Sequence, residues 1–206
     1  MGTYARSVHP SMPPLTFPTT RLAVLALIVA FAGCGGDDRT PAPDLDAQLL
    51  AAAAANDVEA ARRLIDRGAD VNAKDASQES AYLLATSEIG DDPRLLELTL
   101  SSGADVNAKD RFNGTGLIRA AERGYVRIVR RLLHTDIEID HVNRLGWTAL
   151  LEAIILGEGG RAHTETVRAL VDAGADVSIA DGDDVAPLAH ARERGYDAIV
   201  AILRAA

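Results

Sequence analysis

Apolar and polar residues follow one order that returns along most of the chain. An apolar pair is followed within a few residues by glycine, and then apolar and polar residues alternate. This order is found at Leu64–Asp75, returns nearly unchanged at Leu100–Asp110 and Leu170–Asp181, and takes a degenerate form at Leu132–Asp140. The glycine position falls at residues 68, 103, 136 (an aspartate) and 174, so the copies lie 35, 33 and 38 residues apart. A phrase that recurs at this spacing predicts a stacked array of repeats.

Each copy predicts the end of a helix followed by a short extended arm. Glycine ends the helix in the left-handed conformation, which costs other residues about 1–2 kcal/mol. The alternation then turns Ala69 and Val71 to one side and Asp70 to the other, as in a strand with one buried side. Asn72 and Asp75 are expected to be turn residues that bond their own backbone.

Five repeats are expected between residues 45 and 206, at 45–75, 76–110, 111–143, 144–181 and 182–206. The first departs from the others, as a terminal cap does, and Asp44 or Asp46 is expected to cap its first helix. Surplus residues are expected in loops between helices, at 90–93 in the second repeat and in a flexible loop at 157–164 in the fourth.

The degenerate copy predicts a weak point in the array. Asp136 stands where the other copies have glycine. Aspartate adopts the left-handed conformation less readily than glycine. The joint between the third and fourth repeats is therefore expected to open before its neighbours.

The repeated endings resemble the ankyrin repeat, whose consensus ends in G-A-D-V-N-A and opens with T-P-L-H-x-A. The corresponding openings are weaker and lie at Ser80–Leu83, Thr115–Ile118, Thr148–Leu151 and Ala186–Ala189. The family histidine, which ties neighbouring repeats together by hydrogen bonds, is replaced by an apolar residue in each opening, and apolar packing is expected there. The resemblance covers about residues 45–206 and implies an all-α repeat solenoid of stacked helix-turn-helix units with short β-hairpin connections.

The first 44 residues indicate export and anchoring rather than folded structure. The apolar run Leu22–Ala32 has 11 residues, too few for a bilayer span of about 20 but suited to an export signal at residues 1–33. The ending Phe31-Ala32-Gly33-Cys34 resembles a bacterial lipoprotein cleavage box, which implies a lipid on Cys34 and a flexible tether at 34–44. An ordinary secretory signal, an uncut anchor and a start at Met12 remain alternatives.

Charge narrows the class of partner. The net charge is −9, and residues 1–33 contain two arginines and no acid, so the remainder carries about −11. This balance disfavours non-specific binding of nucleic acid and suits either a basic protein partner or ordinary solvation.

The sequence shows no catalytic constellation and implies no cofactor. Cys34 is the sole cysteine, so neither an internal disulfide nor a structural zinc set with spaced cysteines is available. His163 and Glu165 are either a metal pair or parts of an ordinary polar loop. Asp91 and Asp92 are either an acidic ion-binding pair or helix caps.

One series of carboxylates recurs with the repeat. It consists of Asp70, Asp105 and Asp176. Because these residues belong to the repeated phrase, we expect their role to be structural. No enzyme activity is expected of this chain.

The resemblance implies a partner surface made of hairpin tips and the exposed side of each first helix. Mapped onto this sequence, that surface contains Ser77, Glu79, Glu88, Arg111, Phe112, Arg119, Glu122, Arg123, Arg144, Leu145, Trp147, Glu152, Asp183, Val185, Glu193 and Arg194. Phe112 and Trp147, flanked by Arg111 and Arg144, are the expected centre, since Trp and Arg are enriched in binding hot spots. The alternative is that Trp147 packs on the next repeat.

These features predict a non-enzymatic, monomeric protein-interaction scaffold of the bacterial envelope. A lipid anchor at Cys34 would make it periplasm-facing, and without the anchor it would be a soluble periplasmic protein. Inhibition of an exported toxin or enzyme, protection or assembly of a periplasmic enzyme, and a structural envelope role without a defined ligand are the alternatives.

Overall fold

The computed structural model describes residues 44–206. The predicted signal at 1–33, the proposed lipid site at Cys34 and the tether up to residue 43 lie outside the described residues.

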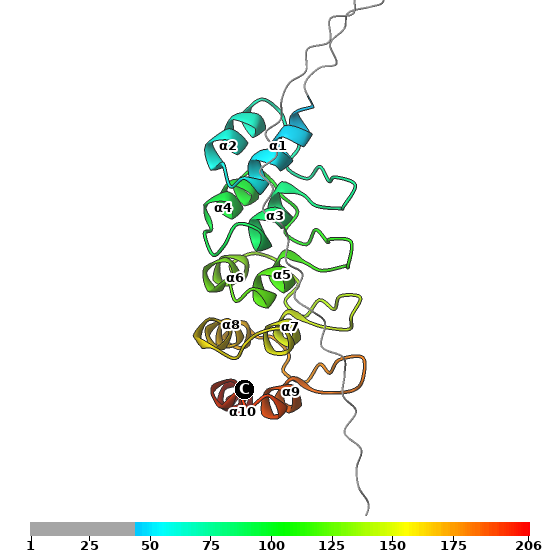
Figure 1. The fold of residues 1–206 in the computed structure, drawn as a ribbon, viewed down its shortest axis with the longest axis vertical. Helices are drawn as coiled ribbons and strands as arrows, with labels where there is room; N and C mark the ends of the chain where they lie inside the picture. Colours follow the sequence, from blue (N-terminus) through cyan, green and yellow to red (C-terminus); the bar gives the residue numbers. More distant parts are fainter. Residues whose placement is uncertain (1–43) are drawn as a thin grey trace, which may run out of the picture. The chain divides into compact units, whose positions relative to one another are not determined.

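Ten helices, arranged as five pairs, make up residues 44–206 (Figure 1). The pairs are α1 (Leu45–Ala54) with α2 (Val58–Asp66), α3 (Ala81–Ser87) with α4 (Arg94–Ser101), α5 (Gly116–Glu122) with α6 (Val126–Leu132), α7 (Ala149–Ile155) with α8 (Arg161–Asp172), and α9 (Pro187–Glu193) with α10 (Asp197–Ala205). The first helices stand in one column and the second helices in another. The predicted all-α repeat solenoid is confirmed.

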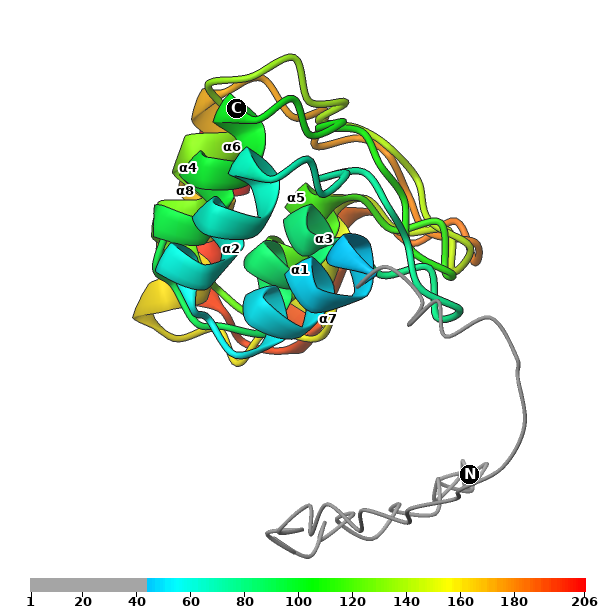
Figure 2. The same cartoon turned by 90° about the horizontal axis from the view of Figure 1, so that it is seen from above.

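The connections between pairs are long loops that leave the helices on one side (Figure 2). Each of the last four pairs is preceded by a turn closed by two backbone hydrogen bonds, for example from the N–H of Asp110 to the carbonyl of Gly114 and from the N–H of Asn113 to the carbonyl of Asp110, both at 3.0 Å. Within residues 44–206 the only β-bridge joins Lys109 and Thr115. We call these turns hairpins, although they contain no regular strand in that range.

Helix starts follow the polar residues of the openings. Asp44 caps α1 by accepting from the N–H groups of Asp46 and Ala47, both at 3.1 Å. Ser80, Thr115 and Thr148 accept in the same way from the residue three positions on, at the starts of α3, α5 and α7. Helix α9 has no side-chain cap and begins with Pro187.

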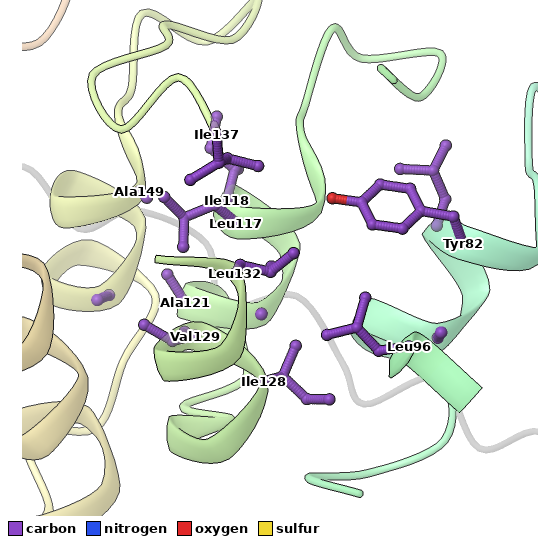
Figure 3. Packing of buried hydrophobic residues seen from close by; sticks show 14 of the residues in the cluster. Tyr82, Leu96, Leu117, Ile118, Ala121, Ile128, Val129, Leu132, Ile137 and Ala149 are labelled. Atoms are coloured by element: carbon purple, nitrogen blue, oxygen red, sulfur yellow. The ribbon is translucent and has the colours of Figure 1, made fainter. Parts of the chain in front are cut away.

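Apolar side chains of neighbouring pairs form one continuous core (Figure 3). Leu117 of α5 and Ile128 and Leu132 of α6 are fully buried. The replaced histidine positions of three openings are also buried, at Leu83, Ile118 and Leu151. The expected apolar packing at these three positions is therefore confirmed, whereas Ala189 in the last opening is exposed.

Hydrogen bonds between repeats are made by Asn72 and the equivalent residues, and not by the position of the family histidine. Asp75 bonds its own loop, as predicted, but Asn72 does not. The Asn72 side chain accepts from the N–H of Asp105 at 2.8 Å and donates to the carbonyl of Gly103 at 3.0 Å. The prediction that the Asn72 side chain bonds its own backbone is wrong, because the next repeat offers these two groups within reach of its amide.

The same tie recurs along the array, and we call it the seam. Asn107 accepts from the N–H of Glu138 at 2.9 Å and donates to the carbonyl of Asp136 at 3.0 Å. In the next copy Asp140 accepts from the N–H of Asp176 at 3.0 Å. A carboxylate has no proton to donate, so the seam loses one hydrogen bond there.

Asp136 does not adopt the conformation of the glycines that it replaces. The glycines at positions 68, 103 and 174 have φ values of 98°, 88° and 95°, but Asp136 is not among the residues with positive φ. Thr135 closes that turn instead, with its N–H 2.9 Å from the carbonyl of Leu132. The left-handed strain expected at Asp136 is absent, so the reason given for a weak joint is wrong.

The surplus residues of the fourth repeat mostly lengthen a helix. Helix α8 begins at Arg161, so only Gly157–Gly160 remain as the loop. The Tyr196 hydroxyl donates to the carbonyl of Gly157 at 2.9 Å, and a Cβ on Gly159 would overlap the Tyr196 ring. The prediction of a flexible loop across 157–164 is wrong, because the last repeat packs on this segment.

None of the helices in residues 44–206 combines the length and the apolar character needed to cross a bilayer.

Candidate protein-binding surface

Each of the last three hairpins is held by the side chain of its first residue. In the hairpin before α5, Oδ1 of Asp110 accepts from the N–H groups of Phe112 and Gly114, both at 2.8 Å. Asn143 and Asp181 do the same in the hairpins before α7 and α9, with distances of 2.9 to 3.1 Å. The backbone at each tip is thereby fixed, and with it the direction in which the tip side chains leave.

The second polar atom of these residues contacts the side chain nine positions on, in the first helix of the pair. Oδ2 of Asp110 lies 3.0 Å from Nη1 of Arg119, and the Asn143 amide donates to Oε1 of Glu152 at 2.7 Å. Nε2 of His190 lies 2.7 Å from Oδ2 of Asp181. The two aspartates thus face basic side chains, and the asparagine faces the acidic side chain of Glu152. The hairpin and helix side chains are chemically matched.

Arg119 makes contacts within the domain and is not part of an open surface. Its side chain is only 12% exposed, and Nη1 also lies 2.9 Å from Oε1 of Glu79 in the preceding repeat. Nη2 donates to the Ser87 hydroxyl at 2.6 Å. These contacts join the second and third repeats. The guanidinium of Arg119, which was predicted to contact a partner, is therefore engaged internally, and so is Oε1 of Glu79.

Glu152 was predicted to be an exposed partner contact, but its side chain is buried. The residue is 4% exposed, and its Oε2 has no hydrogen-bond partner among the described residues. Burial, followed by the charge of Glu122, raises the pKa of Glu152 from 4.5 to about 7, and the Asn143 hydrogen bond only partly opposes this shift. The carboxylate is held inside the domain by its hydrogen bond from the Asn143 amide, a contact that the sequence did not predict.

Beside Glu152 lies a hollow of about 230 Å³ between the hairpins that precede α5 and α7, which we call the repeat 3–4 hollow. Three exposed apolar side chains line it: Phe112 (55% exposed), Leu145 (58%) and Leu156 (48%). Glu122 and Glu152 are among its polar residues. Leu156 was missed from the sequence, where it reads as the last core residue of a helix.

The expected centre around Phe112 is held in place by its neighbours. The Arg111 guanidinium lies 4.7 Å from the centroid of the Phe112 ring. Arg144 donates its backbone N–H to the carbonyl of Phe112 at 3.1 Å and its Nη1 to the carbonyl of Arg111 at 2.7 Å. Trp147 is partly buried and lies outside the core cluster of the described residues. Three of the four residues expected at the centre thus form one connected unit.

The other predicted contacts spread along the hairpin side of the array. Ser77, Arg123 and Asp183 are exposed. Arg194 is partly buried, with its Nη1 3.3 Å from Nδ1 of His190. None of these four lines the repeat 3–4 hollow, so they flank the centre rather than form it.

The residues weighed for metal binding have other partners. Nε2 of His163 lies 3.0 Å from the carbonyl of Glu122, and Glu165 pairs with Arg161 at 2.7 Å. Asp91 accepts from the N–H groups of Arg127 and Ile128 at the start of α6, at 2.8 and 3.0 Å. Nowhere in residues 44–206 do three His, Cys, Asp or Glu side chains gather as a metal set.

Asp92 and the aspartates that recur with the repeat have structural roles. Asp92 accepts from the N–H of Arg94 at 3.2 Å at the start of α4. The recurring Asp70, Asp105 and Asp176 each accept from the N–H two residues on, at 2.8 to 2.9 Å. The structural role expected of this series is confirmed.

Similar proteins agree with this architecture. The family description "Ankyrin repeats (3 copies)" matches residues 82–181 and 117–205, and "Ankyrin repeat" matches residues 49–76. The ankyrin repeat protein YahD of Escherichia coli (strain K12) is 41% identical over 144 residues, which are 69% of this chain and 71% of that protein.

Two solved structures share the fold. An ankyrin repeat domain (ABAYE2397) from Acinetobacter baumannii AYE has a TM-score of 0.72 at 48% identity, covering 76% of this chain and 79% of that one. The ankyrin repeat protein EF0377 has a TM-score of 0.70 at 38% identity, covering 76% and 78%. Ankyrin repeats generally mediate protein–protein interaction, and no enzyme family is indicated for this chain. The stacked helix pairs, the glycine-ended helices and these relatives show that the chain belongs to the ankyrin repeat family.

Proposed function

We propose that this protein is a non-enzymatic binding module of the bacterial envelope that holds a protein partner on the hairpin side of its third and fourth repeats. The observation that carries the proposal is the repeat 3–4 hollow, where Phe112, Leu145 and Leu156 remain exposed around one depression. Exposed apolar side chains gathered at one place favour a binding role over ordinary solvation.

The fixed backbone of this region supports the proposal. Asp110 and Asn143 hold the two hairpin tips, and Arg144 ties one tip to the other. A surface that is already ordered loses little conformational entropy when it binds. The partner therefore meets a rigid platform.

The envelope location rests on the sequence of the first 44 residues. A lipid on Cys34 would hold the array near a membrane through the tether, and the net charge of −9 favours a basic partner. Replacing Cys34 by alanine is expected to abolish incorporation of labelled palmitate and to release the protein from the membrane fraction. Incorporation that persists in Cys34→Ala contradicts the lipid anchor.

Capture of the partner tests the binding role. The full chain, solubilised from the envelope with detergent, is expected to retain one stoichiometric protein, and Phe112→Ala is expected to lose it. Val142→Ala is the matched control, because Val142 is also an exposed apolar residue (40%) but does not line the hollow. Retention of no protein by the wild-type chain favours a structural envelope component without a defined ligand.

Trp147 gives a second measurement on the same face. If it contacts the partner, Trp147→Ala weakens binding by about 2 kcal/mol or more and changes the melting temperature little. A large loss of thermal stability with unchanged affinity assigns Trp147 to packing on the next repeat instead.

Masking of an exported enzyme or toxin is a second candidate function. It is favoured by the acidic charge of the chain, since an anchored acidic surface suits a basic active site. Identification of the captured protein as an exported enzyme, together with loss of its activity on binding, would support this candidate.

A further inference from the structure

The repeat 3–4 hollow joins an apolar rim to an acidic interior. Phe112, Leu145 and Leu156 form the apolar part, and the carboxylates of Glu122 and Glu152 lie among the polar residues. Lysine and arginine side chains match this arrangement, because each has an apolar stem that can contact the apolar residues and a charged end that can contact the carboxylates.

The charges of the hollow do not cancel within the domain. Arg119 is the one base among its lining residues, and it is paired with Asp110 at 3.0 Å and with Glu79 at 2.9 Å. Glu122 and Glu152 then remain as acids without a basic partner in the hollow. The electrostatic potential there favours a cation.

Glu152 provides an independent observation. The residue is only 4% exposed, and Asn143 occupies only Oε1. Oε2 has no hydrogen-bond partner among the described residues. A buried acceptor without a donor carries a desolvation cost. A donor supplied from outside would remove that cost.

We propose that the repeat 3–4 hollow receives one lysine or arginine side chain of the protein partner, with its stem against Phe112 and Leu145 and its cationic end directed to Glu152. The volume of about 230 Å³ fits this occupant. It lies below the roughly 300–1,000 Å³ of sites that enclose whole small molecules. The inference rests on the proposed function, because it names the partner chemistry of the same surface.

The protonation of Glu152 gives the site a characteristic pH response. The charged groups around the carboxylate are Glu122 of α5 and Asp110 and Arg119, which pair with each other. Burial and the neighbouring acids raise the pKa of Glu152 to about 7. An incoming cation favours the ionised form, so binding is expected to be tighter at pH 8 than at pH 6.

Peptide selection tests the inference without the natural partner. Short random peptides displayed on phage are selected against the full chain in detergent, and only peptides whose binding is lost in Phe112→Ala are kept. These peptides are expected to share a lysine or arginine. Replacing that residue by norleucine is expected to weaken binding to the wild-type chain about tenfold.

The variants assign this preference to one carboxylate. In Glu152→Gln the preference for the basic residue over norleucine is expected to fall to about twofold or less, and in Glu122→Gln to fall in part. Glu158→Gln is the control, because Glu158 is an exposed acid that does not line the hollow. It is expected to keep the full preference, and melting curves check that each variant is folded.

The outcomes separate this inference from the proposed function. Phe112-dependent peptides without a basic residue, or an unchanged preference in folded Glu152→Gln, overturn the inference while the binding surface stands. A selection that returns no Phe112-dependent peptide overturns both.

Discussion

Several side chains of this protein are chemically complementary to the residue that faces them. Asn143 stands where the neighbouring hairpins have aspartate, and it faces Glu152. An aspartate at that position would place two carboxylates in contact, whereas the amide donates a hydrogen bond. The local chemistry therefore follows the pair and not the repeat consensus.

Glu152 makes stability depend on pH. Its pKa of about 7 in the folded protein lies above the ordinary value of 4.5. Between these values the folded state binds more protons than the unfolded state, so the free energy of unfolding falls as pH rises through that interval. Glu152→Gln is expected to stabilise the protein at pH 8 by on the order of 1–3 kcal/mol and to have little effect at pH 4.5.

Urea unfolding at the two pH values measures this difference. Glu158→Gln, an exposed acid outside the hollow, is expected to change stability little at either pH. Equal stabilisation by Glu152→Gln at pH 4.5 and pH 8 would show that the ionisation of Glu152 is not the cause.

Gly116 allows two repeats to approach closely. A Cβ at this position would lie 2.5 Å from the Tyr82 hydroxyl oxygen and 2.9 Å from Cγ2 of Thr86. The same hydroxyl donates to the carbonyl of Val106 at 2.7 Å and cannot easily move away. Gly116→Ala is expected to cost about 1–3 kcal/mol in chemical denaturation.

Gly182→Ala is the matched control for this substitution. No atom lies within 4 Å of a Cβ built on Gly182, and its φ is not positive. Little change is expected there. A Gly116→Ala variant as stable as Gly182→Ala would mean that the contact with Tyr82 relaxes freely.

At the scale of the helix pair, the seam sets how firmly neighbours are joined. Asn72 and Asn107 each make two hydrogen bonds across it, and Asp140 makes one. The carbonyl of residue 174 corresponds to the acceptors at residues 103 and 136. The weaker seam thus lies between the third and fourth repeats, although for a reason other than strain at Asp136.

Asp140→Asn is expected to restore the missing donor and to raise the free energy of unfolding by about 0.5–1.5 kcal/mol. The reverse change at the equivalent position, Asn107→Asp, is expected to lower it by a similar amount. Amide exchange at Asp176 and its neighbours reports the local effect. Destabilisation by both substitutions would contradict the proposed role of the seam.

The sequence predicted those elements whose signal lies within one repeat. The helix-ending glycines at 68, 103 and 174 and the cap at Asp44 follow from local backbone chemistry, and the structure confirms them. The spacing of the repeats was enough to predict the stacking.

Contacts between repeats were beyond the sequence. Asp91 was weighed either as part of an ion-binding pair or as a helix cap, and the helix that it caps is α6 of the following repeat. Arg119 and Glu152 were assigned to an open surface, yet they are engaged by residues of neighbouring elements. The pattern of apolar and polar residues in the sequence predicts the side of a helix on which a residue lies, but not which residues of other repeats cover that side. The candidate centre at Phe112 was found because the family resemblance places partner contacts at the hairpin tips.

For the whole molecule, the row of helix pairs means that each repeat is stabilised by its neighbours (Figure 1). Leu132 of α6 is fully buried in the central repeat, and Leu203 of α10 is buried in the last one. In such an array, stability is approximately a sum of repeat terms and neighbour terms. A defect in the middle therefore acts on two sides, whereas a defect at the end acts on one.

Leu132→Ala is expected to cost about 2–5 kcal/mol and to lower amide protection in the second, third and fourth repeats. Leu203→Ala, the matched change at the end, is expected to lower protection mainly in the last repeat. Hydrogen exchange read residue by residue distinguishes the two patterns. Uniform loss of protection across residues 44–206 in both variants would indicate one indivisible unit instead.

The matched residues nine positions apart bear on how such chains can be recombined. A crossover between Asn143 and Glu152 would bring together a hairpin from one parent and a helix from another, and two carboxylates could then meet. Crossovers placed before the hairpin keep each couple intact. Chimaeras of this protein with its relatives are therefore expected to fold best when hairpin and following helix are inherited together.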